Sequence, residues 1–293
     1  MILGFICVVL ASIAFGIGPV FAKELMICGL DTMNILLWPK ISTLLVAGVV
    51  MLSRRISLKV TKTQLWQLFL FCGCSNGLTA LMLVSSYRLL PIGLATMFHF
   101  IYPTIVTVIM LVLFKEKVSA LKIIAIVLAI SGLSLIFDLS GSMSFPGVAL
   151  ALGSGCTYAI YIVATRKSAY RELHALVLIF YSSAINFLAV AIYLLVTGGL
   201  IIPVTGREWL FITSNGLISG LFAFFILIAG IKRIGASNAA IANMLEPLTA
   251  LVAGVIIYGD RIEFKALCGC ILVIIAITLI TIKNKNYQPD GEL

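Results

Sequence analysis

Two ionisable side chains stand within long apolar stretches of this sequence, where a charge is costly to keep. Glu246 is followed directly by Pro247, and Lys40 comes directly after Trp38 and Pro39. At the centre of a membrane helix, even a lenient insertion scale assigns a cost of about 2.5 to 3.5 kcal/mol to an acidic or basic group. Both groups are therefore expected to face a partner or a solute pathway rather than lipid.

Each of these two groups suits more than one kind of chemistry. The Glu246 carboxylate could carry a coupling proton or serve as counter-ion for an amine on a solute. It could instead satisfy backbone groups that Pro247 frees, because proline lacks an N–H. The Lys40 ammonium could hold a solute carboxylate, pair with Glu246, or extend its long stem to the membrane interface. The residues alone leave these alternatives open.

Polar groups also precede the prolines of two later apolar stretches. His99 lies four residues before Pro103, and Asn243 lies four residues before Pro247. A histidine within a membrane is either a hydrogen-bonded packing residue or a proton relay, and the matched positions of His99 and Asn243 favour a role at a cavity. Tyr102, directly before Pro103, stands where the second half has an acid. The helix breaks expected at the cavity are Pro39, Pro103 and Pro247.

Amides and aromatic rings supply weaker candidates. Asn76 lies within a Gly-x-x-x-Gly pattern at 73–77, and Asn215 lies beside a second one at 216–220. Such small-residue faces mostly serve close helix packing, although the amides could also hydrogen-bond a polar solute. The other candidates, which could line a cavity or simply pack, are Asn186, Tyr158, Tyr161 and Phe15. The predicted substrate pathway comprises Lys40, Asn76, His99, Tyr102, Tyr158, Asn215, Asn243 and Glu246.

The composition excludes whole classes of function. The chain has 293 residues, of which 62% are hydrophobic and 11% charged, and its mean hydropathy is +1.19. A soluble domain carries about 25% charged residues, so a soluble enzyme, a disordered chain and a nucleic-acid binder are excluded despite the formal charge of +9. Because no P-loop, HExxH or CxxC pattern is present, we predict no ATPase, catalytic residue, metal or cofactor. The seven cysteines are expected to be small packing residues.

Ten apolar runs are long enough to cross a membrane, because about 20 apolar residues span the hydrocarbon core. The sequence therefore predicts an all-α integral membrane protein with ten transmembrane helices. The first run lacks the basic N-terminal region of a signal peptide, so we expect it to be retained. The expected spans are residues 3–22, 32–52, 66–87, 92–114, 119–137, 147–165, 175–197, 209–230, 236–258 and 264–282.

The distribution of Lys and Arg predicts how these spans are oriented. If both termini are cytoplasmic, the inner segments hold fourteen basic residues and the outer segments hold five. Basic residues are retained on the cytoplasmic side of a membrane, so this bias predicts cytoplasmic N and C termini. The net charge of +9 is thus interpreted as an orientation signal.

The two halves of the chain match each other at an offset of 143 to 144 residues. Gly73 matches Gly216 at an offset of 143, and Pro103 matches Pro247 at an offset of 144. Each half is a unit of five spans, and this odd number makes the second unit enter the membrane inverted. Inverted repeats place a substrate site near the bilayer midplane, between halves that rock against each other. The predicted units are 1–140 and 141–283, followed by a short polar cytoplasmic tail, 284–293.

Three segments in each half resemble the signatures of a known family. In the second half they are Arg233 to Ala240, Glu246-Pro247 and Tyr258 to Arg261, and in the first half Leu90 to Ala95, Tyr102-Pro103 and Phe114 to Lys117. On these motifs, the chain resembles the EamA family of the drug/metabolite transporter superfamily over residues 3–282. The resemblance implies a ten-helix secondary transporter that works without ATP, most often an exporter of amino acids or other small metabolites. It also implies that spans one, three, four, six, eight and nine line the cavity, with spans five and ten peripheral.

The expected function is secondary-active transport of a small polar organic metabolite, such as an amino acid or amine, across a prokaryotic cytoplasmic membrane. Export is the favoured direction, and protons coupled through Glu246 are the candidate driving ion. The alternatives are import of an amine or nucleoside-like metabolite and, in another class, a non-transporting receptor or scaffold. The expected partners are a small-molecule substrate and the lipid bilayer, with no nucleic acid and an open oligomeric state. Family members usually carry Arg in place of Lys40 and often Trp in place of Phe15, so the resemblance does not identify the substrate.

Overall fold

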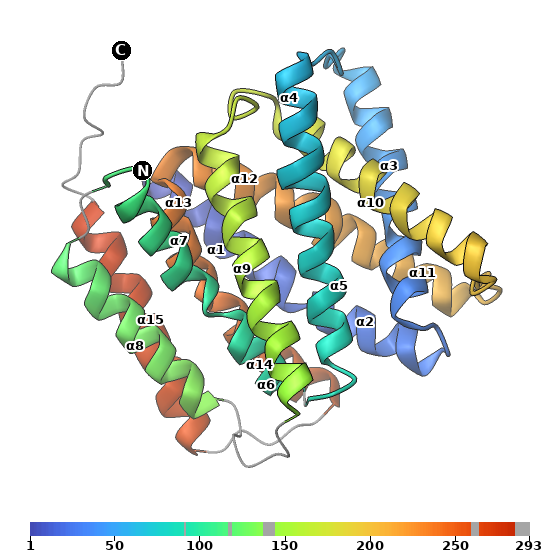
Figure 1. Ribbon diagram of the computed structural model, residues 1–293. Coiled ribbons are helices and arrows are strands. Elements are labelled where there is room, and N and C mark those ends of the chain that lie inside the picture. The colour runs from blue at the N-terminus through green and yellow to red at the C-terminus, as the bar shows by residue number, and fades with distance from the viewer. Residues whose placement is uncertain (91, 117–118, 137–143, 259–263, 285–293) are drawn as a thin grey trace.

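The computed structural model describes residues 1–90, 92–116, 119–136, 144–258 and 264–284. Within these ranges every regular element is a helix. Nine helical stretches are long and apolar enough to cross a membrane, and a further apolar helix, α8 (Ala120–Ile136), is shorter, with 17 residues. The chain is thus an all-helical, multi-pass membrane protein (Figure 1). The nine stretches are Ile2–Ile27, Thr32–Ser53, Lys62–Ser86, Leu94–Val112, Phe145–Lys167, Ala175–Thr197, Gly206–Ile234, Ala236–Ile257 and Phe264–Thr281.

Some of the sequence predictions concern residues that the structure does not describe. Within the matched motifs these are Pro91, Lys117, Gly259, Asp260 and Arg261. The predicted polar tail also lies outside the described residues, except for its first residue.

The third and eighth spans begin earlier than their apolar runs. They start at Lys62 and Gly206, because Thr61 and Thr205 each form a capping box with the residue three positions later. A capping box satisfies free N–H groups of the first turn, so a helix can start before its apolar face does.

Two spans, one in each half, are interrupted at matched positions. One consists of α6 (Ile92–His99) and α7 (Tyr102–Val112), and the other of α13 (Ala236–Ala242), the 3-10 segment η3 (Asn243–Leu245) and α14 (Glu246–Tyr258). Pro103 and Pro247 stand in the first turn of the second piece, where the N–H that proline lacks would have no helical partner anyway. The interruptions place Tyr102 and Glu246 at the start of a helix within a membrane span.

The first span is also interrupted, at a proline that the sequence analysis did not single out. Its pieces are α1 (Ile2–Gly16) and α2 (Gly18–Ile27), with Pro19 in the first turn of α2. The corresponding span of the second half, α9 (Phe145–Lys167), is continuous. The two halves therefore differ in the first of their five spans.

The helix break that we expected at Pro39 is absent. The helix α3 (Thr32–Ser53) runs through Pro39 without interruption. Nearby hydroxyl groups supply extra bonds, because Ser42 and Thr43 donate to the Pro39 carbonyl at 2.9 and 3.1 Å. These bonds are made to the carbonyl of Pro39 itself, whereas the carbonyl that proline leaves without its helical donor is that of Ile35, four residues earlier.

The third span of each half contains a π-helical segment that no sequence pattern predicted. In the first half the elements are α4 (Lys62–Gln67), the π segment η1 (Leu68–Ser75) and α5 (Asn76–Ser86). In the second half they are α11 (Gly206–Ser214), the π segment η2 (Asn215–Ala223) and α12 (Phe224–Ile234). π-Helical turns are rare and frequently occur at functional sites.

The two halves interlock through their first spans. In the first half α1 packs on α12 and α14, and in the second half α9 packs on α5 and α7. The first span of each half therefore contacts the third and fourth spans of the other half. The main buried core lies where these helices meet and includes the fully buried side chains of Val8, Tyr102 and Leu227.

Glycine contacts between the halves follow the sequence offset. A Cβ atom on Gly77 would collide with Asn186 of α10 (Ala175–Thr197), and one on Gly220 would meet Thr43 of α3 at 2.6 Å. Gly77 and Gly220, like Thr43 and Asn186, are 143 residues apart. A Cβ atom on Gly73 would likewise meet Ile185, and one on Gly216 would meet Ser42. The corresponding residues of these two contacts are also 143 positions apart. The third span of each half therefore packs on the second span of the other half at equivalent positions. The glycines allow this close approach because they carry no side chain.

The fifth span of the first half and the last span of the second pack on each other at one edge of the bundle. Figure 1 shows α8 beside α15 (Phe264–Asn284), away from α3 and α10. Gly132 and Gly269 face each other there, because a Cβ atom on Gly132 would lie 2.6 Å from the Gly269 carbonyl oxygen. This close backbone approach joins the halves at the periphery.

Replacing Gly132 with valine should separate α8 from α15, because the new side chain would collide with backbone. We expect the free energy of unfolding to fall by about 2 kcal/mol, as is typical for overpacking of a tight contact. Thermal unfolding in detergent, followed by circular dichroism, measures the change. Gly206→Ala is the control, since a Cβ atom there meets nothing within 4 Å. Equal melting temperatures for Gly132→Val and the wild type would contradict the expectation.

The N-terminus and the C-terminal end of α15 lie at the same end of the bundle (Figure 1). An even number of spans, with the shorter α8 counted beside the nine longer stretches, requires this placement.

Candidate functional site

A hydrogen-bonded cluster joins the two halves at the helix interruptions. Its central residue is Asn243, which is buried and lies in η3. The Asn243 amide donates to the Tyr102 hydroxyl at 3.0 Å and to Glu246 Oε2 at 3.1 Å. The Ser12 hydroxyl lies 3.0 Å from Asn243 Oδ1, and it also lies 2.8 Å from the Val8 carbonyl. Residues of the first, fourth and ninth spans thus meet at one amide.

The interrupted backbone explains why these groups meet. Tyr102 and Glu246 each open a helix, so their side chains project from the break rather than from a continuous helical face. Tyr102 is fully buried, and its hydroxyl donates to the Ala240 carbonyl at 3.4 Å. Gly16 keeps α1 close, because a Cβ atom there would lie 2.7 Å from the Glu246 carbonyl oxygen.

The other half has a related contact at its own interruption. His99 is buried, and its Nδ1 lies 2.8 Å from the Ser154 hydroxyl of α9. His99 and Asn243 are 144 residues apart, and Ser12 and Ser154 are 142 residues apart. In each half, the polar residue before the proline therefore bonds a serine from the first span of the other half.

A row of aromatic rings leads away from this cluster. Tyr158 makes an edge contact with Tyr102 at a centroid distance of 4.8 Å and stacks on Tyr161 at 5.8 Å. Tyr161 in turn contacts Phe224 at 5.9 Å, and Phe224 contacts Phe15 at 4.8 Å. The rings belong to spans from both halves, so they form a continuous aromatic wall between them.

A small cavity lies beside Tyr161 and Phe224 of this wall. It is lined by Lys40, Asn76, Tyr161, Leu178, Ile179, Ser182, Ser183, Gly220 and Phe224. Its volume of about 10 Å³ leaves room for about one water molecule. A larger solute can enter only if the surrounding helices or side chains move.

A model described as the EamA-like transporter family matches the sequence twice, over residues 2–138 and 145–282. The chain belongs to the EamA-like transporter family. The resemblance to this family of the drug/metabolite transporter superfamily is thereby confirmed. The family is one of transporters rather than enzymes.

Two curated relatives illustrate where this EamA-like transporter stands. It is 28% identical over 209 residues to YvbV, an uncharacterized transporter of Bacillus subtilis (strain 168), and the match covers 68% of this chain and 66% of YvbV. It is 26% identical over 219 residues to the threonine/homoserine exporter RhtA of Salmonella typhimurium (strain SL1344), covering 72% of this chain and 70% of RhtA. The chain therefore spans slightly less than two thirds of the length of YvbV.

A solved crystal structure shares the fold of this EamA-like transporter. The two superpose with a TM-score of 0.80 over 96% of this chain and 98% of that chain. Their sequences are 15% identical, so the likeness concerns the fold alone.

The predicted pathway residues fall into two groups in this EamA-like transporter. Tyr102, Asn243 and Glu246 form the cluster, with Tyr158 in ring contact and with His99 nearby, 5.4 Å from the Tyr102 ring. Lys40 and Asn76 line the cavity, whereas Asn215 belongs to neither group. The alternative that Lys40 pairs with Glu246 is wrong, because no ion pair joins these two described residues.

Several residues at the site were not among the predicted set. Ser12 bonds the central amide, and Ser182 and Ser183 line the cavity from the seventh span, which the family resemblance had not placed there. A sequence signal existed for the last two, since Ser182, Ser183 and Asn186 stand together within an otherwise apolar run. Among the residues that the structure covers, no three His, Cys, Asp or Glu side chains are grouped as a metal ion would require.

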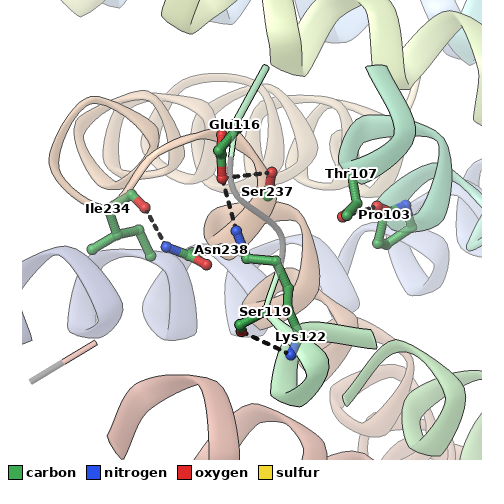
Figure 2. Close-up of polar contacts among 8 residues, drawn as sticks. All are labelled: Pro103, Thr107, Glu116, Ser119, Lys122, Ile234, Ser237 and Asn238. Carbon is green, nitrogen blue, oxygen red and sulfur yellow. Dashed lines mark hydrogen bonds and ion pairs between the residues drawn. The ribbon is translucent and has the colours of Figure 1, made fainter. Parts of the chain in front are cut away.

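An acidic side chain ties the two halves together at the end of the bundle that carries the N-terminus. Figure 2 shows the Glu116 carboxylate between Lys122 of α8 and Ser237 of α13. The Lys122 ammonium lies 2.8 Å from Glu116 Oε1, and the Ser237 hydroxyl donates to the same oxygen at 3.3 Å. Ser237 is buried. Glu116 and Lys122 belong to the first half and Ser237 to the second, so this contact closes one end of the interface.

Replacing the Glu116 carboxylate with a neutral amide should weaken the contact between the two halves at that end of the bundle. Glu116→Gln should destabilise the state in which this end of the interface is closed by about 1 kcal/mol relative to the state in which it is open. The open state should therefore be about fivefold more populated. A cysteine placed at the buried Ala240, in a chain without its native cysteines, reports the change through its labelling rate with a membrane-impermeant maleimide. Glu172→Gln is the matched control, because the Glu172 side chain is 83% exposed. Equal labelling rates in Glu116→Gln and the control would contradict the expectation.

Proposed function

We propose that this chain is a secondary-active exporter of a small polar metabolite, such as an amino acid, in the cytoplasmic membrane of a prokaryote. The solute binds between the two five-helix halves and is released by alternating access. Both termini face the cytoplasm in this proposal, in keeping with the excess of basic residues on that side.

One observation carries the proposal most directly: a polar cluster lies where membrane helices from both halves are interrupted. Asn243, Tyr102 and Ser12 connect three spans through hydrogen bonds. Interrupted helices at the contact between inverted repeats are the usual setting of a transporter's binding site. The family membership supports transport, and the name of one relative, a threonine/homoserine exporter, supports export of an amino acid.

Proton coupling through Glu246 is part of this proposal. Within the described part of the chain, the Glu246 carboxylate has a single hydrogen-bond partner, Asn243. It lies near the middle of the span Ala236–Ile257, where a charge without further compensation is costly. A carboxyl group in this position can bind a proton in one state of the cycle and release it in the other.

The test is transport of labelled amino acids in proteoliposomes with and without a pH gradient. We expect the gradient to accelerate net transport by the wild type. In Glu246→Gln the gradient should have no effect, while exchange of solute between the two sides continues. Glu172→Gln, an exposed acid in a loop, is the control and should respond as the wild type does. An unchanged response in Glu246→Gln would contradict proton coupling, and absence of any solute movement by the wild type would contradict transport.

A further inference from the structure

Lys40 is an unpaired cation inside the protein. It is the only charged residue lining the cavity in the described part of the chain. Within that part, its ammonium forms no ion pair and no hydrogen bond. A buried or half-buried charge is retained only at a considerable cost unless a counter-charge is supplied. The position therefore needs a negative partner.

The carboxylates of neighbouring spans do not supply this partner. Glu24 Oε2 accepts from the Arg207 guanidinium at 2.6 Å. The Glu246 carboxylate accepts from Asn243 at 3.1 Å and lies outside the residues that line the cavity. The counter-charge of Lys40 can then come from the solute itself.

The neutral groups beside Lys40 are suited to an anion. The Ser182 hydroxyl already donates to the Cys72 carbonyl at 2.6 Å, and the Asn76 amide reaches Ser182 only through a long bond of 3.4 Å. The hydroxyl of the buried Ser183 donates to no other residue that the structure describes. Asn76 and Ser183 can therefore turn their donors toward an oxyanion held by Lys40.

The remaining side chains that line the cavity are largely apolar. Tyr161 and Phe224 present their rings, and Leu178 and Ile179 add aliphatic surface. A site that combines one cation and two donors with apolar side chains fits an acidic group attached to a hydrocarbon part.

We infer that the Lys40 cavity, once the surrounding helices or side chains move to widen it, is an anion subsite that takes the carboxylate of an organic monocarboxylate, with its apolar part against Tyr161 and Phe224. This inference deepens the proposed transport function and rests on it. One cation with neutral donors balances one negative charge, so a phosphate dianion would remain partly uncompensated. An amine without a carboxylate would bring a second positive charge beside Lys40 and is rejected.

Binding is tested by thermal shift of the purified full-length protein in detergent. The probes are the amino acids and short fatty acids, each beside the primary amide in which a neutral group replaces the carboxylate, and inorganic phosphate. We expect at least one carboxylate, but neither its amide nor phosphate, to stabilise the wild type. Lys40→Arg should retain this binding, and Lys40→Met should weaken it by about tenfold or more, because a charge-assisted hydrogen bond is lost.

The outcomes separate this inference from the proposed function. The inference is wrong if no carboxylate stabilises the wild type, if the amides or phosphate do so equally well, or if Lys40→Met binds as the wild type does. Exchange of the stabilising solute in proteoliposomes then tests transport independently. Binding without exchange would overturn the transport proposal alone, and exchange of an amine unaffected by Lys40→Met would overturn the anion subsite alone.

Discussion

The Asn243→Leu variant should be inactive in transport and should unfold well below the wild-type temperature. Leucine has a similar volume but cannot bond Ser12, Tyr102 or Glu246, which all contact the Asn243 amide. Each buried polar group left without its bond costs about 1 to 3 kcal/mol. We therefore expect the free energy of unfolding to fall by about 3 kcal/mol, measured by thermal unfolding in detergent beside solute exchange in proteoliposomes.

Asn238→Leu is the matched control for this variant. Asn238 lies on the same short helix, α13, and makes one local hydrogen bond, to the Ile234 carbonyl at 2.8 Å. Its replacement should cost about 1 kcal/mol or less and leave exchange measurable. If Asn243→Leu and Asn238→Leu lost stability and exchange to the same degree, the cluster would have no special role.

The second large effect is expected at Gly155, where α9 passes the interruption of the fourth span. A Cβ atom there would lie 2.7 Å from the His99 carbonyl oxygen and 2.8 Å from Ile101. Because backbone cannot rotate away as a side chain can, Gly155→Ala should push α9 from the interruption and break the bond between Ser154 and His99. We expect a loss of about 2 kcal/mol in the free energy of unfolding and a large drop in the exchange rate.

Gly153→Ala provides the comparison, since it places the same methyl group on the same helix. A Cβ atom at Gly153 would meet only the end of the Met82 side chain, at 2.8 Å, and methionine adapts easily to new neighbours. Alanine also favours helix over glycine by up to about 1 kcal/mol at either position. Gly153→Ala should thus be neutral or stabilising, and equal loss in both variants would show that the approach at Gly155 is not tight.

Much of the helical layout could be predicted, because hydropathy and proline positions act locally. Apolar length gives the spans, and the motifs around Pro103 and Pro247 coincide with the two matched interruptions. The π segments could not be predicted in this way. They lie where Gly73 and Gly216 approach α10 and α3 closely, and these contacts join parts of the chain that are distant in sequence. Hydropathy likewise does not reveal that α3 continues through Pro39.

The candidate site was predictable as a set of residues but not as an arrangement. A charge or amide within an apolar run is conspicuous, which is why Lys40, Asn243 and Glu246 could be selected. Their division between a cluster and a separate cavity depends on how the helices pack. Ser12 was missed because a serine in a membrane helix commonly bonds its own backbone, as this one also does at Val8.

The glycine contacts that recur at an offset of 143 residues have a consequence for how the duplicated chain diverged. Gly73 and Gly77 are still glycines at 216 and 220, as two copies of one interface demand. At the interruption, in contrast, Tyr102 stands at the position that corresponds to Glu246. The copies thus agree at the glycines through which the helices approach, and they differ at a position where only the second half carries an ionisable carboxyl group.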